Sequence, residues 1–293
     1  MGYIFTTCYK LKEIKGLNTF NTCNTSNMRG MFQSCRDINY LDLSNFNTEE
    51  VIDMNRMFNG CLKLKEIKGI NNFNTSKVTN MRAMFQQCLE LEYLDFSNFN
   101  NYNVTDMENM FTKCHKLKEI KGLKNFYTSK AVNMYGMFME CKEIEYLDLS
   151  NFDISNANNI GFMFSRCHKL KEIKGINNFN TANATNMSAF FQECYELKYL
   201  DLSKYNTSNV INMSIMFNEC HKLKEIKGLN NLNTFKVKNM ELMFQKCYEL
   251  EYLDLSNFDT SNVIDISFMF AKCHKIKEIK GISNLNTFNI KNI

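Results

Sequence analysis

The sequence predicts an α/β repeat fold, a solenoid of about eleven coils with a parallel sheet on one side and short helices on the other. Three observations support this fold. Eleven of the twelve cysteines recur at alternating intervals of 27 and 26 residues, each interval contains one strand-like and one helix-like apolar pattern, and no proline occurs in 293 residues. Apolar residues make up 44% of the chain and charged residues 23%, so the chain can bury a core and is not disordered.

The cysteine spacing defines both the repeat and the domain. The regularly spaced cysteines, called the cysteine row below, are Cys8, Cys35, Cys61, Cys88, Cys114, Cys141, Cys167, Cys194, Cys220, Cys247 and Cys273. The repeat unit is therefore a pair of coils of 27 and 26 residues, and it accounts for the whole chain. We expect residues 1–293 to form a single solenoid domain with no evident caps at its ends.

The helix is expected in the segment that leads to each cysteine. Val51, Met54, Met57, Phe58 and Cys61 are separated by 3, 3, 1 and 3 residues, which places them on one face of a helix of about three turns. Thr, Ser and Asn side chains just upstream can cap such a helix.

The strand is expected shortly after each cysteine. Leu64 and Ile67 in one coil, and Leu91, Leu94 and Phe96 in the next, have the pattern of a short strand. A strand, a turn, a short helix and a return within about 26 residues form a right-handed solenoid coil of the leucine-rich-repeat type. Only the 27-residue coils carry a glycine at the end of the strand, and we expect it to accommodate the extra residue as a bulge. These glycines are Gly16, Gly69, Gly122, Gly175, Gly228 and Gly281.

One stretch carries a family resemblance. Residues 253–273, Leu-Asp-Leu-Ser-Asn-Phe-Asp-Thr-Ser-Asn-Val-Ile-Asp-Ile-Ser-Phe-Met-Phe-Ala-Lys-Cys, resemble the repeat of BspA-family leucine-rich-repeat surface proteins and the related Mycoplasma-type repeat of unknown function. The similarity covers essentially the whole chain and recurs in every coil. It implies a leucine-rich-repeat fold and a surface-exposed binding or adhesion protein, whose relatives usually carry a signal peptide and flanking modules that this sequence does not show.

Two rows of side chains should lie on the exposed face of the sheet, because side chains alternate faces along a strand. The residue after the second apolar strand position alternates in sign: Lys15, Asp42, Lys68, Asp95, Lys121, Asp148, Lys174, Asp201, Lys227, Asp254 and Lys280. Opposite charges on neighbouring strands favour this register by some tenths of a kcal/mol per pair. Two positions earlier, glutamate alternates with tyrosine.

The tyrosines of that second row are the candidate partner-binding residues. They are Tyr40, Tyr93, Tyr146, Tyr199 and Tyr252, called the tyrosine row below. The resemblance implies that partners bind on the face of the sheet, and tyrosine is a common anchor at interfaces. The alternative interpretation is that the tyrosines cover the sheet and pack against the aliphatic parts of the lysines.

The sequence predicts no metal, cofactor or catalytic site. Parallel side chains on stacked coils fit disulfide geometry poorly, so the cysteine row is expected to be buried and reduced. His115, His168, His221 and His274 each follow a cysteine, but adjacent side chains point apart, whereas zinc needs four converging ligands. No phosphate-binding loop, nucleophile elbow or metalloprotease motif occurs, and the polar residues recur as near-copies, unlike the single asymmetric constellation of an enzyme.

We therefore expect a non-enzymatic repeat scaffold that binds a protein or glycan partner. The net charge of +4 is too small to indicate binding to nucleic acid, and no apolar run is long enough for a membrane span. Uncapped ends also allow end-to-end self-association. The resemblance implies the cell surface, yet no signal peptide precedes the repeats. The alternatives are an intracellular protein-interaction module and a truncated repeat segment of a longer protein.

Overall fold

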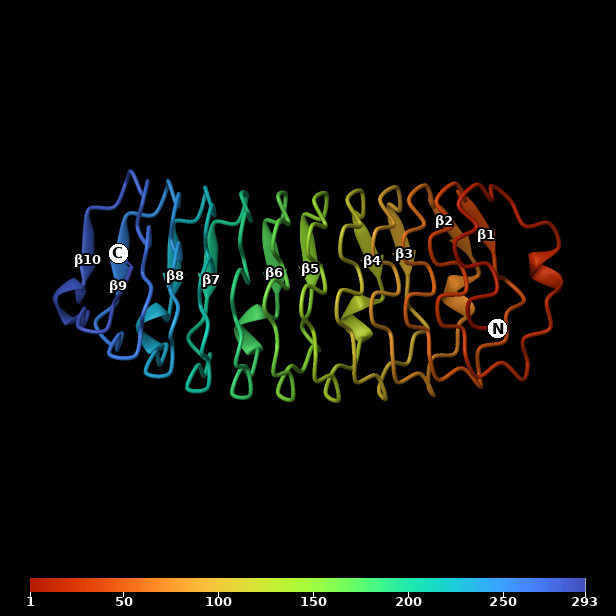
Figure 1. Ribbon diagram of the computed structural model, residues 1–293, viewed down its shortest axis with the longest axis horizontal. Helices are drawn as coiled ribbons and strands as arrows, with labels where there is room; N and C mark the ends of the chain where they lie inside the picture. Colours follow the sequence, from red (N-terminus) through yellow and green to blue (C-terminus); the bar gives the residue numbers. More distant parts are fainter. Residues whose placement is uncertain (293) are drawn as a thin grey trace.

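The computed structural model describes residues 1–292, which form a parallel β-solenoid whose coils stack in chain order along the long axis (Figure 1). Ten three-residue strands lie on successive coils. They are β1 Tyr40–Asp42, β2 Glu66–Lys68, β3 Tyr93–Asp95, β4 Glu119–Lys121, β5 Tyr146–Asp148, β6 Glu172–Lys174, β7 Tyr199–Asp201, β8 Glu225–Lys227, β9 Tyr252–Asp254 and β10 Glu278–Lys280. About nine full turns lead from β1 to β10, so the eleven coils predicted are not confirmed.

The strands pair two by two. β1 pairs in parallel with β2, with Tyr40 opposite Glu66 and Asp42 opposite Lys68, and the other four pairs, β3–β4, β5–β6, β7–β8 and β9–β10, repeat this register. The parallel strands are as predicted, but within residues 1–292 they form five two-stranded sheets instead of one continuous sheet. Each Tyr-Leu-Asp strand pairs with the Glu-Ile-Lys strand 26 residues later and not with the one 27 residues earlier. Residues 13–15 follow no such strand and are therefore not part of a sheet.

A glycine brings the paired strands together. Gly69, directly after β2, has φ of 83°, and a Cβ atom built on it would lie 2.4 Å from the Ser44 Cα in the preceding coil. Only glycine tolerates both the left-handed backbone and this approach. The six glycines that the sequence places at the strand ends, Gly16, Gly69, Gly122, Gly175, Gly228 and Gly281, each immediately precede a short 3-10 helix. These helices are η1 Leu17–Thr19, η2 Ile70–Asn72, η3 Leu123–Asn125, η4 Ile176–Asn178, η5 Leu229–Asn231 and η6 Ile282–Asn284.

The α-helices predicted before each cysteine are wrong. Within residues 51–61, residues 55–60 form turns and Asp53 forms isolated β-bridges, and among the described residues the six 3-10 helices are the only helices. Arg56 and Gly60 have φ of 55° and 73°, which a right-handed helix does not permit. The fold class is therefore a β-solenoid and not α/β. None of the described helices is long or apolar enough to cross a membrane.

Hydrogen bonds between coils explain why turns replace the helix. The amides of Met54, Arg56 and Phe58 donate to carbonyl oxygens 26 residues later, at 3.0, 2.9 and 2.9 Å. A helix would use these amides within the same segment. Apolar spacings of 3, 3, 1 and 3 fit tight stacked turns as well as a helix, and pairing with neighbouring coils satisfies every second amide.

The equivalent segments of successive coils are also joined by ten isolated parallel bridges. They join Asn27, Asp53, Asn80, Asp106, Asn133, Asn159, Asn186, Asn212, Asn239, Asp265 and Asn292 in order.

The core consists of stacked rows of identical side chains. Phe32 and Phe58 are parallel, with ring centroids 5.7 Å apart, and Phe58 and Phe85 follow at 5.3 Å. The thiol of Cys61 donates to the carbonyl of Phe32 at 3.1 Å, and the same contact recurs along the cysteine row. The cysteines from Cys35 to Cys247 in that row are free and buried, as predicted.

Candidate partner-binding face

The tyrosine row lies on the solvent side of the strands. Tyr40, Tyr93, Tyr146, Tyr199 and Tyr252 begin the odd-numbered strands, and 40% to 61% of each residue's surface is exposed. In each of these strands the leucine that follows the tyrosine is buried, because consecutive side chains point to opposite faces. The backbone therefore presents the five tyrosines along one face of the solenoid.

Each tyrosine has a glutamate beside it on the paired strand. Tyr40 lies opposite Glu66, and Tyr146 lies opposite Glu172. Among residues 1–292, neither the hydroxyl groups of the tyrosine row nor these glutamate carboxylates form a side-chain hydrogen bond or an ion pair. Both groups are therefore available to a partner.

The lysine and the aspartate at the other end of each strand pair form an ion pair with each other. The Lys68 ammonium lies 3.2 Å from the Asp42 carboxylate, and the equivalent pairs of β3–β4, β5–β6, β7–β8 and β9–β10 lie at 3.0 to 3.3 Å. These ion pairs join only coils whose strands pair, so each aspartate uses one lysine neighbour and not the two that the alternation predicts.

Serine, more than lysine, holds these aspartates in the charged form. The hydroxyl and the amide of Ser203 both donate to Asp201, and with the Lys227 ammonium they lower the pKa of that carboxyl to about 2. The same serine contacts also lower the pKa of Asp42 and Asp254. The aspartates therefore shape the turn after each odd-numbered strand, which leaves tyrosine and glutamate as the uncommitted groups of the face.

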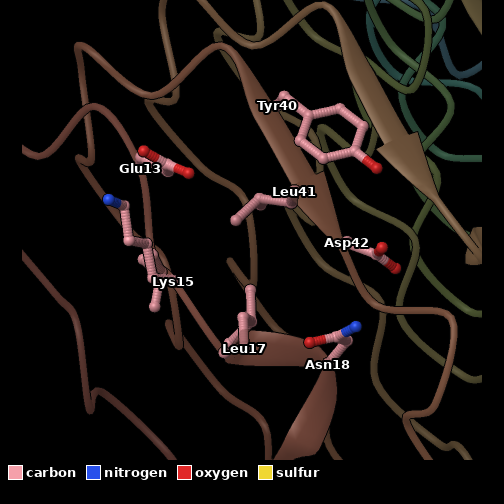
Figure 2. A pocket seen from close by; sticks show the side chains of 9 residues that line it. Glu13, Lys15, Leu17, Asn18, Tyr40, Leu41 and Asp42 are labelled. Atoms are coloured by element: carbon pink, nitrogen blue, oxygen red, sulfur yellow. The ribbon is translucent and has the colours of Figure 1, made fainter.

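Hollows open beside Tyr40, Tyr93, Tyr146 and Tyr252, at junctions where neighbouring coils do not pair through strands. In the hollow of Figure 2, Glu13 and Lys15 lie on one side and Tyr40 and Asp42 on the other, while Leu41 points between them. Its volume is about 160 Å³. Equivalent hollows, called sheet-face hollows below, lie between β2 and β3, between β4 and β5, and between β8 and β9, with volumes of about 460, 220 and 220 Å³.

The difference between the two kinds of coil produces these hollows. At the 26-residue junctions, hydrogen bonds and the glycine contact draw the strands together. At the 27-residue junctions the strand backbones are not paired, so side chains line an open space. The hollows therefore lie at junctions that recur every two coils, roughly 10 Å apart at the usual spacing of stacked strands, and four of these five junctions carry one. Sequence reasoning missed them, because the charge and tyrosine rows are identical at both kinds of junction.

His115, His168 and His221 are half-buried, and His274 is exposed. The rings of His168 and Tyr195 stack at 4.5 Å, and Tyr195 stacks in turn on His221 at 4.5 Å. Burial lowers the pKa of His168. Tyr195 and Tyr248 directly follow a cysteine of the row, as the histidines do. This shared position was the sequence signal from which the histidine–tyrosine stack could have been predicted. Residues 1–292 contain no group of three or more His, Cys, Asp or Glu side chains placed to hold a metal ion.

A family comparison matches the whole chain. The model of the family described as "Mycoplasma protein of unknown function, DUF285" matches residues 1–120, 90–199, 133–248 and 185–293. No curated protein matches the chain in sequence.

Solved structures with similar coils include three bacterial proteins. A leucine rich cell surface protein of Faecalibacterium prausnitzii is 15% identical, with a TM-score of 0.45, and the match covers 85% of this chain and 74% of that one. A leucine-rich repeat protein of Bacteroides ovatus is 16% identical, with a TM-score of 0.33 and coverage of 89% and 85%. A leucine-rich repeat protein of Eubacterium ventriosum is 15% identical, with a TM-score of 0.38 and coverage of 88% and 70%.

Proposed function

The chain belongs to the family of Mycoplasma proteins of unknown function designated DUF285, and we propose that it is a non-enzymatic repeat scaffold that binds a protein or glycan partner along its strand face. The tyrosine row, Tyr40, Tyr93, Tyr146, Tyr199 and Tyr252, forms the anchors of this interface in the proposal. The resemblance to BspA-family proteins supports a location at the cell surface. Self-association through the ends of the array stays a prediction.

One observation carries the proposal. The tyrosine hydroxyls and the adjacent glutamate carboxylates have no polar partner within residues 1–292, and four of the five tyrosines, Tyr40, Tyr93, Tyr146 and Tyr252, border a sheet-face hollow. An exposed aromatic ring beside a hollow gives a large contact area at a small cost in side-chain entropy, which suits an interface anchor. The alternative interpretation, packing of tyrosine on lysine stems, does not account for the hollow or for the unpaired carboxylate.

The repetition of the site indicates the shape of the partner. A single small ligand would need one unique pocket, whereas four similar hollows along one face suit an extended chain that presents a similar group at successive steps. Carboxylate and phenol oxygens accept hydrogen bonds, so the complementary groups are donors such as glycan hydroxyls or protein ammonium and amide groups. Many weak contacts along the face would then add up by avidity.

The test is a comparison of two double variants on glycan and peptide arrays. Replacing Tyr146 and Tyr199 by Ala removes two anchors from the face. Replacing Tyr102 and Tyr127 by Ala is the matched control, since those tyrosines are 53% and 55% exposed but lie outside the strands. We expect the face variant to bind array ligands at least about 10-fold more weakly, as for the loss of interface anchors, and the control to change less than about 2-fold.

Thermal unfolding of both variants completes the test. Both pairs are exposed, so we expect stability changes within about 0.5 kcal/mol per substitution. Equal loss of binding in the two variants, or loss of binding together with a large fall in unfolding temperature for the face variant, would contradict an interface at the tyrosine row.

A further inference from the structure

The repeat is interrupted at one position outside the strand face. The residue after each cysteine of the row is aromatic, histidine or a cation in nine coils and leucine in two, Leu62 and Leu89. In order the row is Tyr9, Arg36, Leu62, Leu89, His115, Lys142, His168, Tyr195, His221, Tyr248 and His274. Arg36 lies over the ring of Tyr9 at 4.6 Å, and the histidine–tyrosine stack occupies the C-terminal part of the row. The two leucines lie between these stacked groups.

A cavity of about 520 Å³ lies over the two leucines. Leu62 and Leu89 are only half-buried and form most of its apolar lining, while Asn39, Lys63 and Lys65 contribute polar atoms from the adjacent positions. We call this cavity the side pocket. Neither leucine lines the sheet-face hollow between β2 and β3, which is the nearest of those hollows.

Most charges at the side pocket are already paired. The Lys63 ammonium lies 2.6 Å from Asp37, and the carboxylate of Glu90 lies 2.6 Å from Lys116. Lys65 has no ion pair or side-chain hydrogen bond within residues 1–292. It is the remaining charged group of the pocket lining.

The interruption of the repeat explains why Lys65 is unpaired. The equivalent lysine two coils later, Lys118, lies 2.7 Å from Glu92 in the preceding coil. The same pair recurs as Lys171–Glu145 and Lys277–Glu251. At Lys65 the preceding coil offers Asn39 in place of glutamate. These coils therefore differ from the repeat in two ways. Leucine replaces the aromatic or charged residue after the cysteine, and the Lys65 ammonium lacks the glutamate carboxylate of the preceding coil.

We propose that the side pocket binds an aliphatic monocarboxylate, with the hydrocarbon chain on Leu62 and Leu89 and the carboxylate on Lys65. Burial of the hydrocarbon against the two leucines supplies the apolar part of the affinity. The carboxylate replaces the glutamate that lies beside Lys118, Lys171 and Lys277, so its charge is complementary to the unpaired ammonium of the lining. Lys65 also lines the sheet-face hollow between β2 and β3, which Tyr93 borders, whereas Leu62 and Leu89 do not line it. The proposal does not depend on the proposed function.

Octanoate is the probe, and the methyl NMR signals of Leu62 and Leu89 report where it binds. We expect saturable shifts of these two residues, with little change at Leu197 and Leu223 in distant coils. Octylammonium, which has the same chain and the opposite charge, is the matched probe and should bind at least about 3-fold more weakly, because its charge repels Lys65.

Two substitutions test the role of the charge. Asn39→Glu restores the carboxylate that the repeat normally has and should weaken octanoate binding about 3- to 5-fold by pairing with Lys65. Asn39→Gln is its neutral control and should leave binding unchanged. Lys118→Gln, at the equivalent position with a paired lysine, should also have no effect. Asn39 and Lys118 are both exposed, so little loss of stability is expected, and the unfolding midpoint verifies that each of the three variants is folded.

Three results would overturn the proposal. They are shifts spread evenly over leucines of all coils, equal affinity for octanoate and octylammonium, and an Asn39→Glu variant that binds octanoate as tightly as the parent. A Leu62→Asn variant adds a check on the apolar part, because it keeps Lys65 and removes half of the floor. Undiminished binding by that variant would likewise contradict the site.

Discussion

Gly69 packs against the backbone of Ser44, one coil earlier, so closely that a Cβ atom at residue 69 would lie 2.4 Å from the Ser44 Cα. This contact occurs where β2 ends beside β1, and it recurs at Gly175 and Ser150 with a corresponding distance of 2.6 Å. Glycine therefore decides which coils approach closely enough for their strands to pair. The sheet-face hollows lie between coils that do not make this contact.

Gly69→Ala should lower the free energy of unfolding by about 2 kcal/mol or more. A left-handed backbone costs an L-residue about 1 to 2 kcal/mol, and the clash with Ser44 adds to it. Gly16→Ala is the matched control, since Gly16 has φ of 75° but a Cβ atom built on it would approach only Thr19 Oγ1, at 3.7 Å. Urea unfolding should show a loss of only about 1 to 2 kcal/mol for the control. Equal losses in the two variants would argue against the close approach.

Asp148 should stabilise the fold through Ser150 more than through Lys174. Its carboxylate accepts a hydrogen bond from the Ser150 amide at 3.1 Å and another from the Ser150 hydroxyl, while Lys174 is exposed. Asp148→Ala should cost about 1 kcal/mol, and Asp148→Asn, which keeps an acceptor oxygen, should cost clearly less. Lys174→Gln should leave the urea midpoint nearly unchanged. A larger effect of Lys174→Gln than of Asp148→Ala would assign the stability to the ion pair instead.

Stability should fall when the pH drops from about 4 to about 2. The pKa of Asp201 is about 2 in the folded protein and 3.8 for an ordinary aspartate, so the folded state binds fewer protons than the unfolded state in this window. The stabilisation is complete above the ordinary pKa and is lost as the pH falls through the folded pKa. Urea midpoints measured between pH 5 and pH 2 should decline less steeply for Asp201→Asn. Parallel curves for the variant and the parent would show that Asp201 does not contribute.

The buried cysteines of the row, from Cys35 to Cys247, should be unreactive in the folded protein, whereas Cys8 at the start of the row is exposed, contrary to the prediction that the whole row is buried. Burial raises the pKa of Cys114 and Cys167 to about 12, so almost no thiolate is available at neutral pH. Cys8 and Cys23 are exposed and should be alkylated by iodoacetamide. Mass spectrometry of the native protein should therefore show rapid labelling at these two residues, and all 12 cysteines should react after unfolding in urea. Rapid native labelling of Cys114 would contradict the packing of the core.

The sequence by itself determined the repeat, the strand positions and the exposed rows. The spacing of Cys35, Cys61 and Cys88 defines the coils, and the alternation around Leu41 and Ile67 places Tyr40 and Lys68 on the outer face, where the structure has them. These features could be predicted because identical residues one coil apart must occupy equivalent positions in a solenoid. The tyrosine row was therefore located without coordinates.

Only the tertiary structure decided how neighbouring coils are joined. The spacing of Met54, Met57 and Phe58 is compatible with a helix or with stacked turns, and the choice depends on whether their amides bond within the segment or to the next coil. Whether two strands pair depends likewise on the close approach of Gly69 to Ser44. The repeat shows where the glycine recurs but not which residue of the neighbouring coil it contacts. The hollows and the side pocket are gaps between coils. A sequence pattern describes one coil at a time, so the fit between coils becomes visible only when they are stacked.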